Sequence, residues 1–377
     1  MNYYELRKHI AGLIPRQGTL SDVRKRMRSA VKEKGRKTNY HQFNLTAGEW
    51  QKNERLLNTE EFRSFIEVSL RASACPMPLN ADTWDGLLCG YGCRYCYADA
   101  FRASLYTAFF DNSKSVGMRV CSPEYFRPEL DKYLANRAKR SVAGTTDIQR
   151  AIDNNIPIRV GIRFEDFLPI ERKRGVTLDL LKYLLENEYP VMINTKSDLV
   201  GCEPYLSALA NNPAKAAVHI TLISSDDGIL KTIEPGAPNF KARLAAMKAL
   251  SEAGVRVVAR IEPYMVFIND EKDIVAQYID DVYDVGVRHI TFDTYSYSAN
   301  NPGIRDNFVR LGWDFVRMFL LTTDSQPIGS LLLGKFMDLF RAKGFRCSTF
   351  DLGNVPDNGD DICCEVGDLF SDSRFNR

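Results

Sequence analysis

The stretch Cys-Gly-Tyr-Gly-Cys-Arg-Tyr-Cys-Tyr at residues 89–97 brings three thiols into one short loop. Cys89, Cys93 and Cys96 are separated by three and then two residues, and two glycines allow the backbone to wrap around a compact metal centre. A 4Fe-4S cluster normally takes four cysteine thiolates. Three ligands leave one iron open, and an open position on a metal is where a substrate or cofactor binds. The loop therefore predicts a catalytic cluster.

The alternatives are a zinc site and three unrelated buried thiols. Structural zinc usually takes a second pair of Cys or His ligands at a matching spacing. No such pair follows Cys96, and the four histidines of the chain show no ligand spacing. We therefore favour an iron–sulfur cluster over zinc.

Composition fits a globular protein of one or two domains. The chain has 377 residues, of which 45% are hydrophobic and 26% charged. No apolar run reaches the roughly 20 residues that span a bilayer, and the N-terminus lacks a signal-peptide pattern. Nine cysteines in such a chain are expected to be reduced thiols and metal ligands. We expect a cytoplasmic location and no membrane partner.

Charge is distributed unevenly along the chain. Residues 1–41 contain eleven Lys or Arg against three acidic residues, a net +8 that leaves −6 for the rest of this +2 chain. A basic arm on an acidic body suggests a polyanionic partner such as DNA. The alternative is a helix with a solvated charged face.

An alternation of strand and helix patterns follows the cysteine loop. The predicted strands are 158–164, 191–195, 217–223, 255–261 and 288–292, and the predicted helices are 177–188, 203–211, 239–253 and 271–285. This order implies a parallel sheet covered by helices. With an extended segment at 83–88 before the loop, we expect an α/β fold of the incomplete (β/α)6 TIM-barrel type, whose site lies at the carboxyl ends of the strands.

Three regions are expected. Residues 1–72 form a basic N-terminal extension, helical in parts to about residue 43 and again at 60–71. Residues 73–300 form the barrel. Residues 301–377 contain two helices, at 305–323 and 330–342, and a loop-rich tail with Cys347, Cys363 and Cys364.

The cysteine spacing, with an aromatic residue directly after Cys96, resembles the signature of the radical SAM superfamily. The resemblance implies that S-adenosylmethionine binds the open iron and that one electron cleaves it to a 5′-deoxyadenosyl radical. It also implies an electron donor such as flavodoxin or ferredoxin. Cys89, Cys93 and Cys96 are then the metal ligands.

Short sequence motifs further along the chain narrow the resemblance to the spore photoproduct lyase branch of this superfamily. Members of this branch are often described as DNA repair photolyase-like. The similarity covers roughly residues 85–295. It is carried by Asn-Thr-Lys-Ser-Asp at 194–198, Ser-Ser-Asp at 224–226, Glu-Pro-Gly-Ala-Pro at 234–238, Glu-Pro-Tyr at 262–264 and Asn-Asp at 269–270.

This resemblance implies cofactor-facing positions at Lys196, Ser197 and Ser224. An ammonium group can pair with the carboxylate of S-adenosylmethionine, and hydroxyls can hydrogen-bond to it. Lys196 could instead cap a helix or pair with Asp198. The Gly-Gly-Glu motif of other radical SAM enzymes is missing from this sequence. Glu165 or Asp166 could replace it, and Glu165 is our candidate cofactor-binding residue.

Tyr95 and Tyr97 are candidate catalytic residues that relay the radical or pack against the cofactor, although packing alone would also explain a tyrosine in this loop. We favour Tyr97, because aromatic packing there would shield the radical from water. The resemblance leaves Glu234 and Arg243 open as a structural or a binding pair.

One departure concerns the hydrogen donor. The lyase branch uses a cysteine after the strand that corresponds to 158–164, but this chain has Arg-Phe-Glu-Asp at 163–166. Cys202, Cys347, Cys363 or Cys364 could replace it, and Cys347 is our candidate catalytic thiol. The last three could also be free thiols or hold an auxiliary cluster.

The predicted function is a radical SAM enzyme of lyase or isomerase type that acts on a thymine-type base in DNA, either intact or already modified or damaged. The missing donor favours rearrangement or modification over dimer repair. Alternatives are modification of a peptide or small molecule and a non-catalytic nucleic-acid-binding metalloprotein.

Overall fold

A computed structural model describes residues 1–13, 60–61, 67–68, 79–86, 89–93, 95–96, 118–135, 146–162, 164–294 and 326–349. The predicted helix at 305–323, most of the basic arm, Tyr97, Cys363 and Cys364 lie outside these residues.

The main sheet has eight strands in the order β11-β10-β9-β8-β7-β6-β3-β2. The seven strands from β3 to β11 are parallel, and β2 pairs with β3 in the antiparallel sense. The predicted α/β fold with a parallel sheet is therefore confirmed. The strands are β2 (Glu67–Val68), β3 (Leu79–Asn80), β6 (Ile158–Val160), β7 (Val191–Thr195), β8 (Ala216–Thr221), β9 (Arg256–Tyr264), β10 (His289–Thr294) and β11 (Arg346–Thr349).

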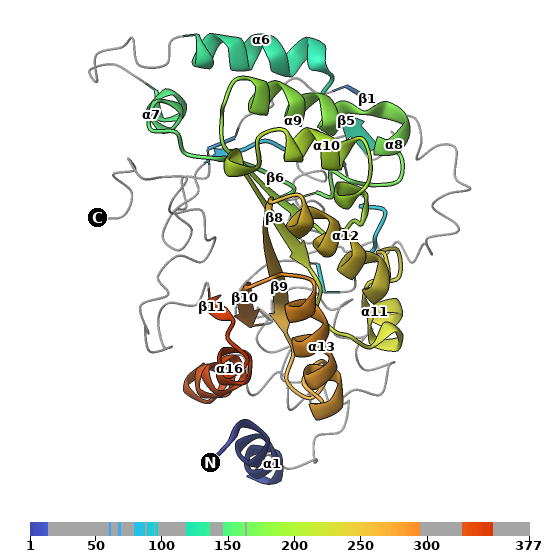
Figure 1. Cartoon of the computed structure of the whole chain (residues 1–377), viewed down its shortest axis with the longest axis vertical. Coiled ribbons are helices and arrows are strands. Elements are labelled where there is room, and N and C mark those ends of the chain that lie inside the picture. Colours follow the sequence, from blue (N-terminus) through green and yellow to red (C-terminus); the bar gives the residue numbers. More distant parts are fainter. Residues whose placement is uncertain are drawn as a thin grey trace, which may run out of the picture.

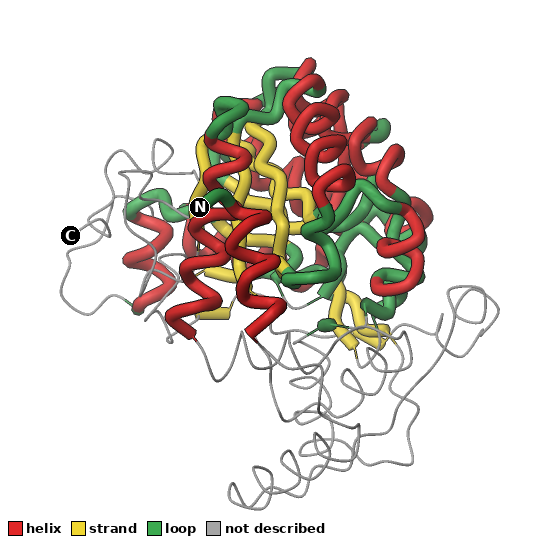
Figure 2. The backbone as a smooth tube through the Cα atoms, turned by 90° about the horizontal axis from the view of Figure 1, so that it is seen from below, coloured by secondary structure: helices red, strands yellow, loops and turns green. Residues whose placement is uncertain are grey.

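Helices connect these strands and lie outside them (Figures 1 and 2). The four helices predicted between strands are present with slightly shorter bounds, as α9, α10, α12 and α13. The α-helices of the described residues are α1 (Tyr3–Leu13), α6 (Pro123–Leu134), α7 (Asp147–Asp153), α8 (Glu171–Arg174), α9 (Val176–Glu186), α10 (Tyr205–Ala210), α11 (Asp227–Ile233), α12 (Phe240–Glu252), α13 (Lys272–Asp284) and α16 (Gln326–Arg341).

The central strands are apolar because both faces of the sheet are covered. Every residue of β7 and β8 is buried, as expected for parallel strands beneath helices. Helix ends follow local rules: the Asn239 side chain accepts a hydrogen bond from Ala242 N at the start of α12. Gly254 and Gly286 follow α12 and α13 with φ of 74° and 93°, the left-handed conformation that favours glycine at a helix end.

The two faces of the sheet differ near β10. Phe292 of β10 packs edge-on against Phe336 and Phe340 of α16, with ring centroids 6.0 and 5.0 Å apart. Successive side chains of a strand point to opposite faces. Thr291 therefore lies on the face away from α16, the concave face of the sheet.

The start of the sheet differs from the prediction. The segment expected at 83–88 contains β4 (Trp84–Gly86), which pairs with β5 (Met118–Val120) in a separate three-stranded sheet that also contains β1 (Glu60–Glu61). Asp166 Oδ1 accepts hydrogen bonds from Thr83 N at 2.7 Å and Trp84 N at 2.8 Å. Because this carboxyl group binds two consecutive amides, the chain leaves the main sheet here.

One more secondary-structure prediction is wrong. The helix predicted at 60–71 is replaced, where the structure describes it, by β1 and β2, because their backbone groups find partners in β5 and β3. The tail begins with β11, which extends the parallel sheet beside β10, and residues 350–377 lie outside the described residues. The helix predicted at 330–342 begins earlier, as α16. The division into three regions stays a prediction.

Helix α1 is anchored to the body of the protein beside α16 (Figure 1). Tyr3 Oη lies 2.6 Å from Tyr264 Oη and donates to Asp270. Arg7 Nε pairs with Asp270 Oδ2 at 3.0 Å, and Arg7 also pairs with Glu271. Arg7 therefore serves an internal contact and does not belong to a polyanion-binding surface. Among the described helices, none is long and apolar enough to cross a membrane.

Candidate functional site: a cysteine loop beside Lys196

The cysteine loop is built from two consecutive tight turns. Gly92 N donates to Cys89 O at 3.2 Å, and Cys96 N donates to Cys93 O at 3.1 Å. Gly92 has a φ of 56°, a conformation that glycine adopts without strain. Burial raises the pKa of the Cys93 thiol well above its usual value, and the charge of Lys196 opposes this rise. The neighbouring Cys96 and Cys89 also influence Cys93, so the three thiols lie in one electrostatic environment.

The chemistry of the donor set fits an iron–sulfur cluster. Cysteine thiolates are the usual ligands of a 4Fe-4S cluster, and three of them stand in this one short loop. Within the described part of the chain, no three His, Cys, Asp or Glu side chains form a ready-made site for a single metal ion. Cys89, Cys93 and Cys96 could hold the cluster.

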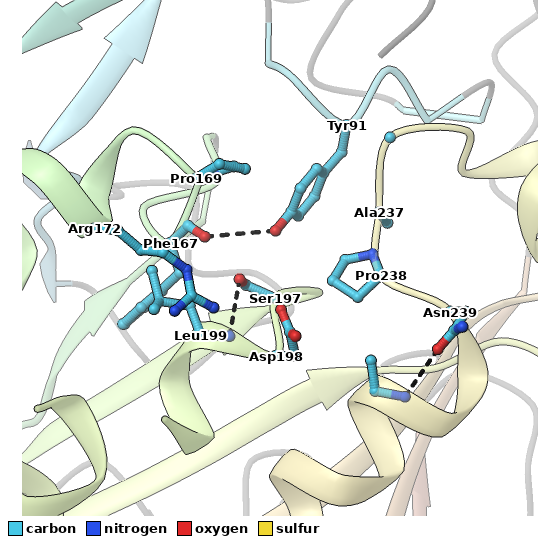
Figure 3. Close-up of a pocket in the computed structure, with 12 residues that line it drawn as sticks. Tyr91, Phe167, Pro169, Arg172, Ser197, Asp198, Leu199, Ala237, Pro238 and Asn239 are labelled. Carbon is cyan, nitrogen blue, oxygen red and sulfur yellow. Dashed lines mark hydrogen bonds between the residues drawn. The ribbon is translucent and has the colours of Figure 1, made fainter. Parts of the chain in front are cut away.

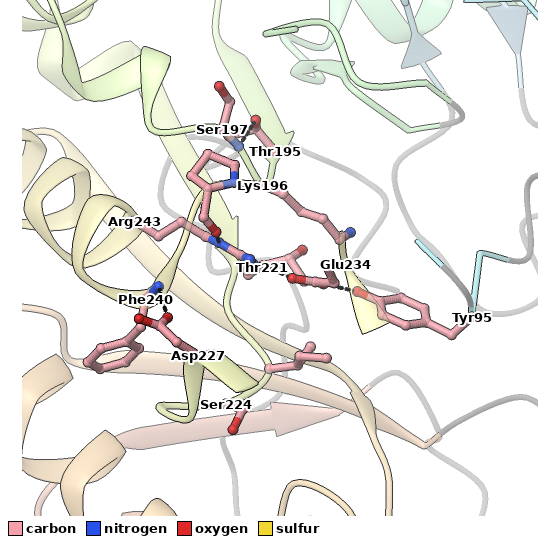
Figure 4. Close-up of polar contacts among 12 residues, drawn as sticks. Tyr95, Thr195, Lys196, Ser197, Thr221, Ser224, Asp227, Glu234, Phe240 and Arg243 are labelled. Atoms are coloured by element: carbon pink, nitrogen blue, oxygen red, sulfur yellow. Dashed lines mark hydrogen bonds and ion pairs between the residues drawn. The ribbon is translucent and has the colours of Figure 1, made fainter. Parts of the chain in front are cut away.

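A buried ion pair fixes the second turn of the loop, which contains Tyr95 (Figure 4). Tyr95 Oη donates to Glu234, whose other carboxylate oxygen lies 2.6 Å from Arg243 Nη2. Both side chains of the pair are 0% exposed. Arg243 also donates to Thr221 O and Pro238 O, each at 2.8 Å. The Glu234–Arg243 pair therefore has a structural role, and it holds Tyr95 in place.

A backbone contact fixes the first part of the loop. Gly236 N donates to Tyr91 O at 3.0 Å. A Cβ atom on Gly236 would lie 2.4 Å from Gly90 O and 2.7 Å from Tyr91 Cα. Only glycine allows this approach, so the segment from Glu234 to Arg243 holds the cysteine loop at two points.

Lys196 follows β7 and points toward this assembly, with its amino group near Glu234 and Tyr95 (Figure 4). Its Nζ lies 5.5 Å from the centre of the Tyr95 ring. Burial lowers the pKa of Lys196, but the charges of Cys93, Glu234, Cys96 and Glu165 outweigh burial and raise it. The lysine stays charged beside the thiols, where a carboxylate could pair with it. Its contact with the cofactor stays a prediction.

The other predicted cofactor residues make local contacts. Glu165 accepts hydrogen bonds from Thr195 Oγ1 at 2.6 Å and Lys196 N at 2.9 Å, so it orders the end of β7. Ser197 Oγ accepts from Leu199 N at 3.2 Å. Ser224 Oγ accepts from Asp226 N at 3.1 Å and lies apart from the Lys196 group (Figure 4).

Cys347 is on the wrong side of the sheet for an active-site thiol. It is 1% exposed, and its sulfur lies 3.8 Å from Met337 O of α16. Its strand neighbour Ser348 lies on the opposite, concave face, where its Oγ is 2.6 Å from His289 Nε2. The position of Cys347 does not support the predicted catalytic role, and it indicates a structural thiol.

A pocket of about 360 Å³ opens beside the cysteine loop (Figure 3). Tyr91 forms one wall, with its hydroxyl group 3.4 Å from Phe167 O. Ser197 and Arg172 line it together with residues around Pro238. The pocket touches the loop and the ends of β6 and β7, which places it at the carboxyl edge of the sheet.

The sequence interpretation missed a second ion pair, on β9. Arg260 pairs with Glu262, and Thr291 Oγ1 donates to Glu262 Oε1 at 2.7 Å. Burial raises the pKa of Glu262, but the charges of Arg260 and Lys196 and two hydrogen bonds lower it below its usual value. The sequence signal was present: charged residues alternate with apolar ones in Arg-Ile-Glu-Pro at the end of a predicted strand.

Comparisons with known proteins agree with this geometry. The Radical SAM superfamily model matches residues 86–280. An uncharacterised protein of Methanocaldococcus jannaschii is 27% identical over 189 residues, 50% of this chain and 62% of that protein. An uncharacterised protein of Mycobacterium tuberculosis is 22% identical over 233 residues, 61% of this chain and 62% of that protein. The chain thus spans 62% of the length of these relatives.

Spore photoproduct lyase has a similar fold. Its structure in complex with a dinucleoside spore photoproduct aligns with a TM-score of 0.52 at 13% identity, covering 86% of this chain and 93% of that chain. A mutant of that enzyme with bound AdoMet and the same dinucleoside aligns with a TM-score of 0.50 at 12% identity and the same coverage.

The family determines the cofactors. Its model covers the cysteine loop, Lys196 and the strands from β6 to β9, and radical SAM enzymes use a 4Fe-4S cluster and S-adenosylmethionine. The chain belongs to the radical SAM superfamily.

Proposed function

We propose that this protein cleaves S-adenosylmethionine reductively and directs the resulting radical at a thymine-type base in DNA. The observation that carries the first half is the cysteine loop, held at two points at the carboxyl edge of the sheet with the charged Lys196 beside it. Strand ends of such α/β folds are where reactive groups gather.

Each residue of the site has a separate task in this proposal. Cys89, Cys93 and Cys96 hold the cluster. When bound, the cluster and S-adenosylmethionine supply a 5′-deoxyadenosyl radical that abstracts hydrogen from an unactivated carbon. Lys196 pairs with the carboxylate of S-adenosylmethionine, and Tyr95, fixed by Glu234, packs beside it and excludes water.

Three remaining roles of the proposal lie outside the described contacts. Ser197 and Ser224 are assigned to donate hydrogen bonds to the cofactor; each accepts one backbone hydrogen bond, and this does not use the O–H group. Tyr97 is assigned to shield the radical. Flavodoxin or ferredoxin would donate the electron.

Two observations support a nucleic-acid substrate. The spore photoproduct lyase with the similar fold was solved with a dinucleoside photoproduct. The first 41 residues carry a net +8, and a basic segment favours a polyanion. Arg7 is excluded from this surface by its contact with Asp270, which leaves ten basic residues in the arm.

We infer the reaction type from the positions of the cysteine thiols that could donate hydrogen to a product radical. The cysteine donor of the lyase branch is missing at 163–166, and Cys347 faces α16. A product radical would then be quenched by another group or rearrange within the base. We therefore propose a rearrangement or modification of the base ahead of dimer cleavage.

The test is 5′-deoxyadenosine formation by the anaerobically reconstituted protein with S-adenosylmethionine and dithionite. The reaction is run without DNA, and with untreated, ultraviolet-irradiated and thymine-modified DNA, followed by mass spectrometry of the digested nucleosides. We expect one DNA to stimulate cleavage and to gain a new nucleoside. Cleavage with every DNA inert would refute the nucleic-acid substrate and leave a peptide or small molecule.

A further inference from the structure

Three consecutive buried residues, Glu165, Asp166 and Phe167, contact two parts of the site that come from different segments of the chain. Asp166 and Phe167 contact the cysteine loop and the strand that leads into it. Glu165 contacts the end of β7 and the backbone of Lys196. This short segment therefore links the cysteine loop to the lysine that is proposed to pair with S-adenosylmethionine.

Asp166 binds the start of β4, which ends at Gly86, just before the cysteine loop begins at Cys89. Its Oδ1 accepts hydrogen bonds from Thr83 N and Thr83 Oγ1, both at 2.7 Å, and from Trp84 N at 2.8 Å. Thr83, Trp84 and Asp166 are each 0% exposed. A buried donor that loses its acceptor keeps its full cost of desolvation, so these bonds fix the position of β4.

Two further contacts hold the same part of the chain. Tyr91 Oη, in the cysteine loop, donates to Phe167 O at 3.4 Å (Figure 3). Trp84 Nε1 donates to Glu171 Oε2 at 2.8 Å, and Glu171 follows Asp166 by five residues. The strand and the loop are thus both attached to the segment that follows β6.

Glu165 binds the end of β7 with both of its carboxylate oxygens. Oε2 accepts a hydrogen bond from Lys196 N at 2.9 Å. Oε1 accepts from Thr195 Oγ1 at 2.6 Å and from Phe167 N at 3.1 Å. The carboxylate therefore fixes the piece of backbone from which the Lys196 side chain extends.

We propose that Glu165 and Asp166 are positioning residues that set the separation between the cysteine loop and Lys196. A cofactor held at both points, by the cluster and by the Lys196 amino group, binds tightly only where that separation suits it. The inference rests on the proposed pairing of Lys196 with the carboxylate of S-adenosylmethionine. It extends that pairing by naming the residues that hold the two halves of the site together.

The hydrogen bonds distinguish this role from a direct contact with the cofactor. Asp166 makes all three bonds through Oδ1, and Oδ2 has no hydrogen-bond partner among the described residues. Asp166→Asn can therefore keep every bond through its carbonyl oxygen. Burial and the charge of Asp82 raise the pKa of Asp166 well above its usual value, so a neutral group suits this position. Glu165→Gln has no such freedom, because its amide would direct N–H groups at the N–H of either Lys196 or Phe167.

The experiment measures the Kd of S-adenosylmethionine by equilibrium dialysis, with the full-length protein carrying its reconstituted cluster and no reductant, so that binding is separated from cleavage. Asp166→Ala should weaken binding about tenfold or more, and Asp166→Asn should bind within about twofold of the wild type. Glu165→Gln should weaken binding about tenfold. Glu252→Gln, in the exposed Lys248–Glu252 pair, is the matched control and should bind as the wild type does.

A double variant tests whether Glu165 acts through Lys196. Lys196→Met should weaken binding about tenfold or more. Adding Glu165→Gln to it should weaken binding no further, because the position of the amino group no longer matters. In 5′-deoxyadenosine formation, Glu165→Gln should raise KM for S-adenosylmethionine with little change in kcat.

Binding by Asp166→Asn that is as weak as by Asp166→Ala would show that the charge itself is needed, and it would overturn the inference. Wild-type binding by Glu165→Gln, or losses that add in the double variant, would overturn it too. If melting curves show that Asp166→Ala does not fold, the two isosteric variants still decide. Wild-type binding by Lys196→Met would instead refute the proposed pairing on which the inference rests.

Discussion

The two Glu–Arg pairs described above, Glu234–Arg243 and Arg260–Glu262, differ in exposure. In the Glu234–Arg243 pair, both side chains are 0% exposed, and the pair holds Tyr95 of the cysteine loop. In the Arg260–Glu262 pair, the side chains are 21% and 16% exposed, and the pair lies on the concave face. The same two residue types therefore serve as an internal clamp in one place and as an open polar surface in the other.

The difference has a physical cause. A charge that is removed from water must be matched by fixed partners, and Arg243 has three, in Glu234, Thr221 O and Pro238 O. A pair that keeps contact with water tolerates change, because solvent replaces a lost partner. Breaking the fully buried pair should therefore destabilise the fold more than breaking the partly exposed pair.

The largest expected effect comes from removing one partner of the buried pair. Glu234→Ala or Arg243→Ala should lower the free energy of unfolding by about 3–5 kcal/mol, because the remaining charge is buried alone. Denaturant titration of each variant measures this. Replacing both partners by apolar residues, as in Glu234→Leu with Arg243→Met, should recover most of the loss, and a double variant as unstable as the singles would contradict the role as a clamp.

Breaking the Arg7–Asp270 pair, which anchors α1, should have an intermediate effect on stability. The side chain of Asp270 is 0% exposed and that of Arg7 is 18% exposed. Arg7→Ala should lower the free energy of unfolding by about 1.5–3 kcal/mol. Burial raises the pKa of Asp270, and Arg7 opposes this rise. Without Arg7 the folded state binds the Asp270 proton more tightly than the unfolded state does, so stability falls as pH rises.

The loss in Arg7→Ala should therefore be larger at about pH 8 than at about pH 5. Unfolding curves at both pH values, for this variant and for the wild type, provide the comparison. A loss that is equal at the two pH values would show that Asp270 is not the partner that Arg7 stabilises.

The backbone contact between Gly236 and Tyr91 of the cysteine loop can be tested without a change of charge. Gly236→Ala places a Cβ atom 2.4 Å from Gly90 O, so the cysteine loop must move. We expect a loss of about 1–3 kcal/mol in the free energy of unfolding and less iron bound per protein after reconstitution. Gly334→Ala in α16, where a Cβ atom meets nothing within 4 Å, is the control and should be neutral or stabilising.

The smallest effect on the fold is expected at the open pair. Arg260→Ala and Glu262→Ala should each lower the free energy of unfolding by about 1–2 kcal/mol, less than a change in the fully buried pair. Thermal melting of these two variants and of Glu234→Ala under the same conditions compares the two pairs directly. A loss at Arg260 as large as that at Arg243 would remove the distinction between the clamp and the open surface.

Most of the strands and helices could be predicted from the sequence, because the spacing of apolar residues reflects which residues are buried. The runs that form β7 and β8 are mostly apolar and wholly buried, and Gly254 and Gly286 follow the helices that they close. The prediction failed where a distant partner decided the local structure. Nothing near residue 67 indicates that β2 pairs with β3, and nothing near Thr83 indicates that Asp166 binds its amide.

The types of residue in the candidate site could be predicted from the sequence. The face of the sheet on which each side chain lies could not. Lys196 lies at the carboxyl edge of the sheet because it directly follows the parallel strand β7. The cysteine loop follows β4 of the separate sheet, and contacts of Tyr95 with Glu234 and of Tyr91 with Gly236 hold it in place. The side of β11 to which Cys347 points depends on register with β10, which no local pattern encodes. The pairing of Arg260 with Glu262 was readable from their spacing of two on one strand.

The measurement that tests the central claim most directly is 5′-deoxyadenosine formation by three anaerobically reconstituted proteins, each with S-adenosylmethionine and dithionite. These are the wild type, Cys93→Ala and the surface control Glu252→Gln. The account predicts product from the wild type and the control at equal rates, and none from Cys93→Ala. Product from Cys93→Ala, or no product from a wild-type protein that contains a full cluster, would contradict it.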